Sequence, residues 1–150
     1  MKKYLILIAG CPATGKSYLI REIKTMFPTV FTITPDEGKE MLADAIGFHS
    51  KEEKKALEKR VWRFYYRVLD TYMEAGKQII VSEYPFSDKQ KPCLQALSEL
   101  YGYQVITIRL IADFEILWQR RRDRDLHSDI HLCHIMTHYR YQDTLQDHRL

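Results

Sequence analysis

Two glycines, a lysine and a serine near the N-terminus have the spacing that suits them to hold phosphate groups. The segment reads Gly10-Cys11-Pro12-Ala13-Thr14-Gly15-Lys16-Ser17, the G-x-x-x-x-G-K-S pattern of a phosphate-binding loop, or P-loop. The glycines allow successive backbone N–H groups to point at phosphate oxygens. We expect Lys16 to reach the β- and γ-phosphates and the Ser17 hydroxyl to coordinate Mg²⁺. Tyr18 follows directly and is included with these eight residues among the nucleotide-binding candidates.

The segments on either side of the P-loop suit a strand and a helix. Residues 3–9 form a nearly continuous apolar run, which is typical of a parallel strand covered on both faces. After the loop, apolar side chains recur at helical spacing at Leu19, Ile20, Ile23, Met26 and Phe27. A P-loop needs this strand and this helix, so the context supports a nucleotide site.

An aspartate follows the second expected strand, over residues 29–34. In open parallel sheets the ligand lies outside the carboxyl ends of the strands, so Asp36 is expected to face the γ-phosphate region. A carboxylate there can accept the proton of an attacking hydroxyl. Asp36 can also cap the helix that follows, and the two roles are compatible.

A glutamate ends the third expected strand, over residues 77–83. P-loop enzymes place at this point an acid that holds the Mg²⁺ shell through water, although most of them use aspartate. Glu83 is the candidate, and Ser82 could substitute as a weaker ligand. A role facing the substrate is equally open for Glu83.

Arginines cluster after Trp118. Arg120 and Arg124 are four residues apart and would share one face of a helix. Such a pair can clamp the transferring phosphoryl group and stabilise its charge, as a lid does. The alternative is a solvated basic helix paired locally with Asp123 and Asp125.

Two further stripes of residues indicate a function less specifically than the P-loop does. A histidine stripe with Cys133 nearby could bind a metal, but a lid segment is the favoured interpretation of His127, His131, His134 and His138. A basic stripe on the longest expected helix could hold an anionic or aromatic acceptor, or form an ordinary polar helix face: Arg60, Arg63 and Arg67.

Four expected strands alternate with helices along the chain. Besides the three above, a strand is expected over residues 104–110. This alternation predicts an α/β fold with a parallel sheet covered by helices. The longest helix is expected over residues 51–75, ending at Gly76. Its buried face is predicted to comprise Leu57, Val61, Phe64, Val68, Leu69 and Tyr72.

Length and composition indicate one globular domain. The chain has 150 residues, of which 45% are hydrophobic and 29% charged, with a formal net charge of +3. The mild positive charge suits anionic substrates without requiring nucleic acid. The three cysteines have neither disulfide-scaffold nor zinc-finger spacing. With no expected membrane span or signal peptide, these features favour a cytoplasmic protein.

After residue 110 only helix and loop are expected, including a helix that Asp113 can cap. P-loop kinase folds usually carry a fifth strand beyond this point. We therefore expect residues 1–150 to form a single P-loop kinase-like domain, either with a minimal core or, as we favour, truncated at its C-terminus.

With these residues in place, the chain resembles the P-loop kinases grouped around polynucleotide kinase and the zeta-toxin-like small-molecule kinases. The P-loop matches that group's Walker A motif, Asp36 its hydroxyl-activating aspartate, and Arg120 and Arg124 its lid arginines. Where polynucleotide kinases carry an arginine three residues after the aspartate, this chain has Lys39, so a nucleic-acid acceptor is possible but not favoured. The resemblance implies a three-layer α/β/α fold with ATP and Mg²⁺ as cofactors.

The primary hypothesis is an ATP-dependent kinase acting on a hydroxyl of an acceptor that the sequence does not identify. Lys16 and the loop amides would bind phosphates, Ser17 and Glu83 would hold Mg²⁺, and Asp36 would activate the acceptor. The alternative is a nucleotide-dependent regulator, although the sequence has no Asn/Thr-Lys-x-Asp guanine signature. A degenerate nucleotide-binding module is disfavoured by the intact Lys16-Ser17 pair. The sequence leaves the oligomeric state open.

Overall fold

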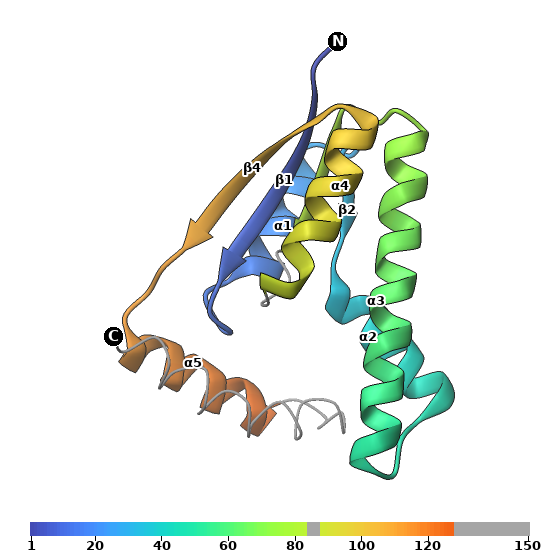
Figure 1. The fold of residues 1–150 in the computed structure, drawn as a ribbon. Coiled ribbons are helices and arrows are strands. Elements are labelled where there is room, and N and C mark those ends of the chain that lie inside the picture. Colours follow the sequence, from blue (N-terminus) through green and yellow to red (C-terminus); the bar gives the residue numbers. More distant parts are fainter. Residues whose placement is uncertain (84–87, 128–150) are drawn as a thin grey trace. The chain divides into compact units, whose positions relative to one another are not determined.

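Four parallel strands form one sheet in the computed structural model, which describes residues 1–83 and 88–127. The strands are β1 (Lys3–Gly10), β2 (Phe31–Ile33), β3 (Ile79–Glu83) and β4 (Tyr103–Leu110), in the order β2-β3-β1-β4 (Figure 1). This arrangement confirms the predicted α/β fold with a parallel sheet. Because all pairings are parallel, β1, β2 and β3 end at the same edge of the sheet.

Helices connect the strands, as parallel pairing requires. The connecting helices are α1 (Lys16–Met26), α2 (Pro35–Ile46), α3 (Lys51–Glu74), a 3₁₀ turn η1 (Asp88–Gln90) and α4 (Lys91–Tyr101). A further helix, α5 (Phe114–His127), follows β4. The chain divides into two compact units. The first contains Met1–Gly10 and Gly15–Leu110, and the second contains Cys11–Thr14 and the chain from Ile111 onward.

The first unit has three layers because successive residues of a strand point to opposite faces. Leu5 and Leu7 belong to a core cluster that includes residues of α3 and α4. Ile8, on the opposite face, belongs to a second cluster with Ile20 of α1. Figure 1 accordingly shows α1 on one face of the sheet and α3 and α4 on the other.

Thr34, and not Asp36, is the N-cap of α2. The Thr34 hydroxyl accepts a hydrogen bond from the Glu37 N–H at 3.3 Å, and Pro35 occupies the first turn. Asp36 therefore lies inside the first turn, where a negative charge interacts favourably with the helix dipole. The expected capping role of Asp36 is wrong, and its carboxylate makes no capping bond in the described structure.

The second strand is shorter than predicted. It spans only Phe31–Ile33, because the chain is still turning at Val30, whose N–H bonds to the Phe27 carbonyl at 3.0 Å. The long helix α3 ends within one residue of its predicted end, with Ala75 as C-cap and Gly76 following at a φ of 69°.

The buried face of α3 differs from the predicted one. Its buried residues recur every four positions, at Leu57, Val61, Tyr65, Leu69 and Met73. Phe64 is instead 42% exposed and lies against Gly38 of α2. Among the described helices, none is long and apolar enough to cross a membrane.

Candidate active site

The P-loop carries the backbone conformations that its glycines were expected to permit. Gly15 has a φ of 95° and is the N-cap of α1. Among the described residues no side chain caps α1, and the first turn of this helix holds no acidic residue. The first N–H groups of α1 therefore have neither a described capping side chain nor a carboxylate in their own helical turn, which suits them to bind phosphate.

The preceding loop residues form a local turn within the second unit. The Thr14 hydroxyl donates to the Cys11 carbonyl at 2.7 Å, and the Thr14 N–H donates to the same oxygen at 3.2 Å. Between them, Ala13 has a φ of 68°, which is uncommon for a residue with a Cβ. Backbone strain of this kind is concentrated at ligand sites.

Lys16 connects the P-loop to the carboxyl ends of two strands. Its Nζ donates to the carbonyl of Gly10, the last residue of β1, at 2.9 Å. The same Nζ lies 3.4 Å from Oε1 of Glu83, the last residue of β3. The Lys16 side chain is only 8% exposed, so this ion pair is shielded from solvent.

Glu83 has spare binding capacity on its second oxygen. Its Oε2 is buried and has no hydrogen-bond partner among the described residues. Burial raises the pKa of the Glu83 carboxyl, and the charge of Asp36 raises it further, while Lys16 opposes both effects. A buried, unsatisfied carboxylate oxygen at this position fits a cation or its bound water, because Mg²⁺ prefers oxygen ligands.

No group of three or more His, Cys, Asp or Glu side chains gathers as a metal cluster in residues 1–83 and 88–127. Mg²⁺ is usually held by only one or two protein oxygens together with phosphates and water. Ser17 and Glu83 fit that pattern. The side chains of His131, Cys133, His134 and His138 lie outside the described residues.

Asp36 is exposed in the first turn of α2, after the carboxyl end of β2. Its charge acts on Glu83, as does that of Glu37. The three acids are therefore near one another at the edge of the sheet where β1, β2 and β3 end. Lys39 is partly buried in the same helix.

Two buried hydroxyl groups lie beside Glu83, and sequence reasoning assigned neither to this arrangement. The Tyr65 hydroxyl of α3 lies 2.6 Å from the Ser82 Oγ of β3. Burial raises the pKa of Tyr65 to about 12, so the phenol stays protonated near neutral pH. The spacing of four between Leu57, Val61, Tyr65 and Leu69 was the signal that places Tyr65 on the buried face.

The predicted lid arginines lie in α5, within the second unit. Arg120 is exposed and Arg121 is buried. The backbone of Arg124 belongs to α5, but its side chain is outside what the structure describes. Phe114 and Trp118 stack in the same helix, with ring centroids 6.4 Å apart.

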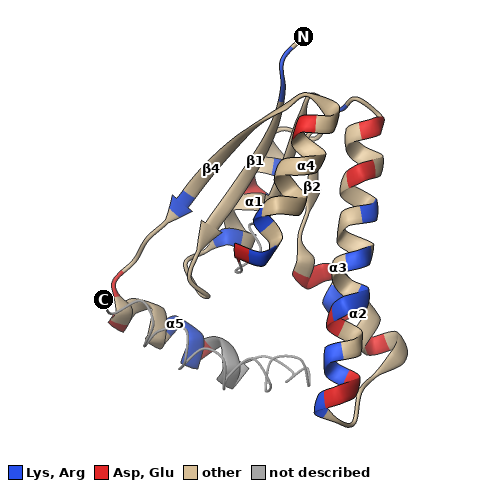
Figure 2. Ribbon diagram, viewed as in Figure 1, with Lys and Arg blue, Asp and Glu red and all other residues tan. Residues whose placement is uncertain are grey.

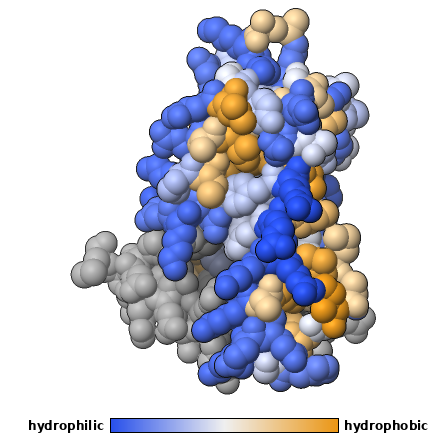
Figure 3. Space-filling view, turned by 45° about the vertical axis from the view of Figure 1, so that its right-hand side comes forward, coloured by the Kyte–Doolittle hydropathy of each residue, from blue (hydrophilic) through white to orange (hydrophobic). Residues whose placement is uncertain are grey.

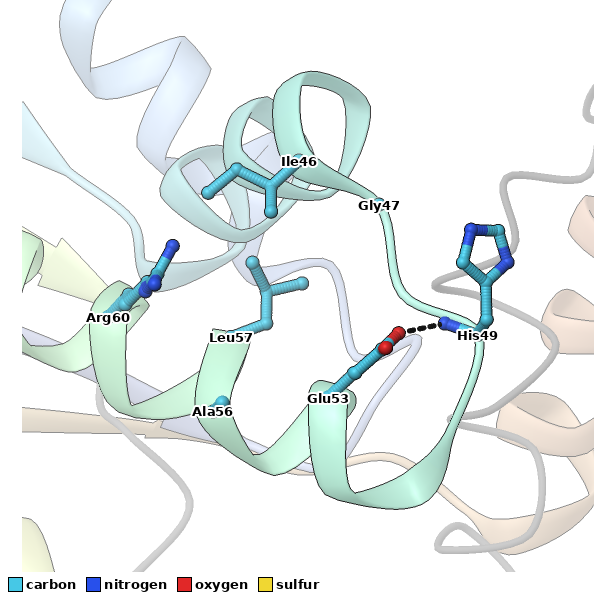
Figure 4. Close-up of a pocket in the computed structure, with 7 residues that line it drawn as sticks. All are labelled: Ile46, Gly47, His49, Glu53, Ala56, Leu57 and Arg60. Carbon is cyan, nitrogen blue, oxygen red and sulfur yellow. Dashed lines mark hydrogen bonds between the residues drawn. The ribbon is translucent and has the colours of Figure 1, made fainter.

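A pocket of about 300 Å³ lies between the far end of α2 and the start of α3 (Figure 4). Its lining residues are Ile46, Gly47, His49, Glu53, Ala56, Leu57 and Arg60. Ten residues of helix separate Asp36 from Ile46, which corresponds to about 15 Å. The pocket is therefore distinct from the phosphate-binding edge of the sheet.

The basic stripe of α3 is exposed to solvent. Arg60, Arg63 and Arg67 are all exposed, and Lys and Arg residues appear as blue bands along this helix in Figure 2. Figure 3 shows hydrophilic side chains running down the same face. Solvent exposure fits the interpretation as a polar helix face and leaves an acceptor-binding role as a prediction.

Known proteins resemble this chain in sequence family and in fold. The sequence matches the zeta toxin family over residues 1–142. No curated protein matches it significantly. The fold is similar to that of a "putative kinase" from Chloroflexus aurantiacus J-10-fl, with a TM-score of 0.73 and 24% identity, covering 84% of this chain and 68% of that one.

Two further solved structures have the same fold. A chain of the Pnkp1/Rnl/Hen1 RNA repair complex has a TM-score of 0.69 and 15% identity, covering 97% of this chain but only 46% of that one. A sugar kinase from Janibacter sp. HTCC2649 has a TM-score of 0.53 and 15% identity, covering 86% and 69%. The family match spans nearly the whole sequence and agrees with the P-loop and the parallel sheet, and so the chain belongs to the zeta toxin family of P-loop kinases.

Proposed function

We propose that this protein transfers the γ-phosphate of ATP to a hydroxyl group of a small-molecule or nucleotide-type acceptor. The observation that carries the proposal is the placement of Lys16, Glu83 and Asp36 around one edge of the sheet, with Lys16 Nζ 3.4 Å from Glu83 Oε1. A cation, a metal-binding acid and a second acid beside a P-loop are the groups that phosphoryl transfer requires.

Nucleotide binding is assigned to residues Gly10 to Tyr18. The loop amides and the N-terminus of α1 would hold the phosphates, and Lys16 would contact the β- and γ-phosphates. Ser17 and Glu83 would hold Mg²⁺, which neutralises phosphate charge when it is bound. In this assignment Lys16 exchanges its partner Glu83 for a phosphate group.

Asp36 is assigned to the acceptor hydroxyl. The hydroxyl oxygen forms a bond to the γ-phosphorus, the bond from that phosphorus to the bridging oxygen breaks, and ADP leaves. The hydroxyl proton passes to Asp36. Its exposed position leaves the Asp36 carboxylate accessible to an incoming acceptor. Arg120 and Arg124 would form the lid that stabilises charge on the transferred group.

A kinase explains the position of Asp36 better than a nucleotide-dependent regulator does, because a regulator needs no group that activates an acceptor. Similarity to a sugar kinase and to a chain of an RNA repair complex makes sugars and 5′-hydroxyl oligonucleotides reasonable members of an acceptor panel. We place the reaction in the cytoplasm, where ATP and Mg²⁺ are supplied.

Transfer from γ-labelled ATP tests the proposal. The acceptors are sugars, amino sugars, nucleosides, nucleoside monophosphates and 5′-hydroxyl oligonucleotides, with Lys16→Ala as the control for contaminating kinases. Label on one acceptor class that is lost with Lys16→Ala is the expected result. Release of label only as inorganic phosphate would instead support the regulator.

A further inference from the structure

The hydroxyl groups of Tyr65 and Ser82 form a buried chain that ends on Glu83. Ser82 is 0% exposed and Tyr65 is 1% exposed. The Ser82 Oγ donates to the Glu83 backbone carbonyl at 3.0 Å. Because a serine hydroxyl has a single proton, the 2.6 Å contact with Tyr65 must use the phenol as donor. The hydrogen bonds therefore run from the Tyr65 hydroxyl through the Ser82 hydroxyl to the backbone carbonyl of Glu83.

Aromatic packing fixes the Tyr65 ring independently of its hydroxyl. Trp62 meets the ring edge-on, with centroids 5.8 Å apart and an interplanar angle of 83°. Tyr66 does the same at 5.2 Å and 78°. The phenol oxygen is thus held at a set place in the core, and Tyr65→Phe removes the hydroxyl while the ring keeps its neighbours.

Glu83, where this series of hydrogen bonds ends, is also the residue whose carboxylate contacts Lys16. Glu83 is the last residue of β3, so its carbonyl is where the strand ends. A hydrogen bond that fixes the Glu83 carbonyl group limits the positions that the Glu83 side chain can take. The buried Oε2 would then be held toward a cation.

We infer that Tyr65 and Ser82 are positioning residues that hold Glu83 in the geometry needed to bind the Mg²⁺ of Mg·ATP. This inference rests on the proposed function, in which Glu83 takes part in the metal site. Groups that orient metal ligands typically change metal affinity 10- to 100-fold when they are removed.

The expected readout is the Mg²⁺ dependence of nucleotide binding, which needs no acceptor. Calorimetry gives the Kd of ATP without and with Mg²⁺. The Kd without Mg²⁺ divided by the Kd with Mg²⁺ is the Mg²⁺ ratio, which measures the contribution of the metal site. For Tyr65→Phe and for Ser82→Ala we expect this ratio to fall about tenfold. Ser82→Ala also keeps the inference testable if Tyr65→Phe fails to fold.

Two further variants separate positioning from stability. In Tyr65→Phe with Ser82→Ala no buried hydroxyl is left unpaired, so thermal stability should return toward that of the wild type. The Mg²⁺ ratio should stay low, because Glu83 is still not held. Tyr103→Phe is the matched control, since Tyr103 donates to the Lys77 carbonyl near the opposite end of β3.

The outcomes distinguish a positioning role of Tyr65 and Ser82 from a purely structural one. An unchanged ratio in both single variants, recovery of the ratio in the double variant, or an equal loss in Tyr103→Phe would overturn the positioning role. So would a wild-type protein whose ATP affinity is independent of Mg²⁺. A wild-type protein that binds no ATP in either condition would overturn the proposed function itself.

Discussion

Lys16 and Glu83 form a shielded ion pair, with Nζ and Oε1 3.4 Å apart. The pair connects the first residue of α1 to the last residue of β3. It leaves Glu83 Oε2 without a partner among the described residues. The P-loop lysine and the candidate metal-binding acid are therefore adjacent at the edge of the sheet where β1 and β3 end.

Replacing Lys16 with Ala should weaken ATP binding and lower turnover by about 10²- to 10³-fold, because the substitution removes the cation facing the developing phosphate charge. Circular dichroism should show that the fold is retained. Calorimetry and steady-state kinetics measure the two effects. Wild-type turnover in this variant would show that Lys16 does not act on the phosphates.

Asp36→Asn should lower kcat by about 10²- to 10⁴-fold while leaving the Kd of Mg·ATP nearly unchanged, because the amide cannot accept the acceptor's proton. Glu37→Gln is the matched control, since it removes a charge from the same turn of α2. Equal losses in the two variants would indicate a general charge effect and would contradict the role of Asp36 as the base.

Glu83→Gln should stabilise the nucleotide-free protein at neutral pH and above. The pKa of Glu83 is raised in the folded state, chiefly by burial, so the folded protein binds more protons than the unfolded chain between the ordinary and the raised pKa. The unfolding free energy therefore falls as pH rises through that window.

The gain in unfolding free energy of Glu83→Gln over the wild type should be small in acid, where Glu83 is already neutral. It should reach a plateau above the raised pKa of Glu83. Urea denaturation across the pH range measures it. A difference that shrinks with rising pH would show that the Lys16 contact outweighs the cost of burial.

Gly38→Ala should stabilise the protein by up to about 1 kcal/mol, because alanine is the better helix former. The added Cβ would lie 3.2 Å from the Phe64 ring. That ring is 42% exposed and has room to shift. A lower Tm would mean that contact with α3 at this point is too tight to relax.

Arg120→Ala should reduce kcat strongly and change the Kd of ATP much less, because the assigned contact is made to the transferring group. Arg122→Ala is the comparison, since both side chains are exposed in α5. Comparable small effects from the two substitutions would favour a solvated basic helix over a lid.

The sequence predicted the parts of the fold where the local pattern and the packing agree. The P-loop, the strand before it and the limits of α3 are examples, because an apolar run, two glycines and a terminal Gly76 each have a specific structural cause. The strand order β2-β3-β1-β4 depends on long-range pairing and was not predicted.

The errors come from choices between neighbouring residues. The predicted buried face of α3 includes Phe64, whereas the structure buries its neighbour Tyr65. The buried hydroxyl of Ser82 offsets the cost of burying the Tyr65 hydroxyl, and that partner is 17 residues away. Thr34 and Asp36 are likewise both good caps, and only the backbone geometry shows that Thr34 serves.

The most direct test of the central claim is to follow the γ-phosphate in one reaction with the best acceptor of the panel. The amounts of phosphorylated acceptor and of free phosphate are measured for the wild type, Lys16→Ala and Asp36→Asn. A phosphotransferase built on Lys16 and Asp36 should give mainly phosphorylated acceptor in the wild type and very little in either variant. Free phosphate alone, or acceptor phosphorylation that persists in Asp36→Asn, would contradict this account.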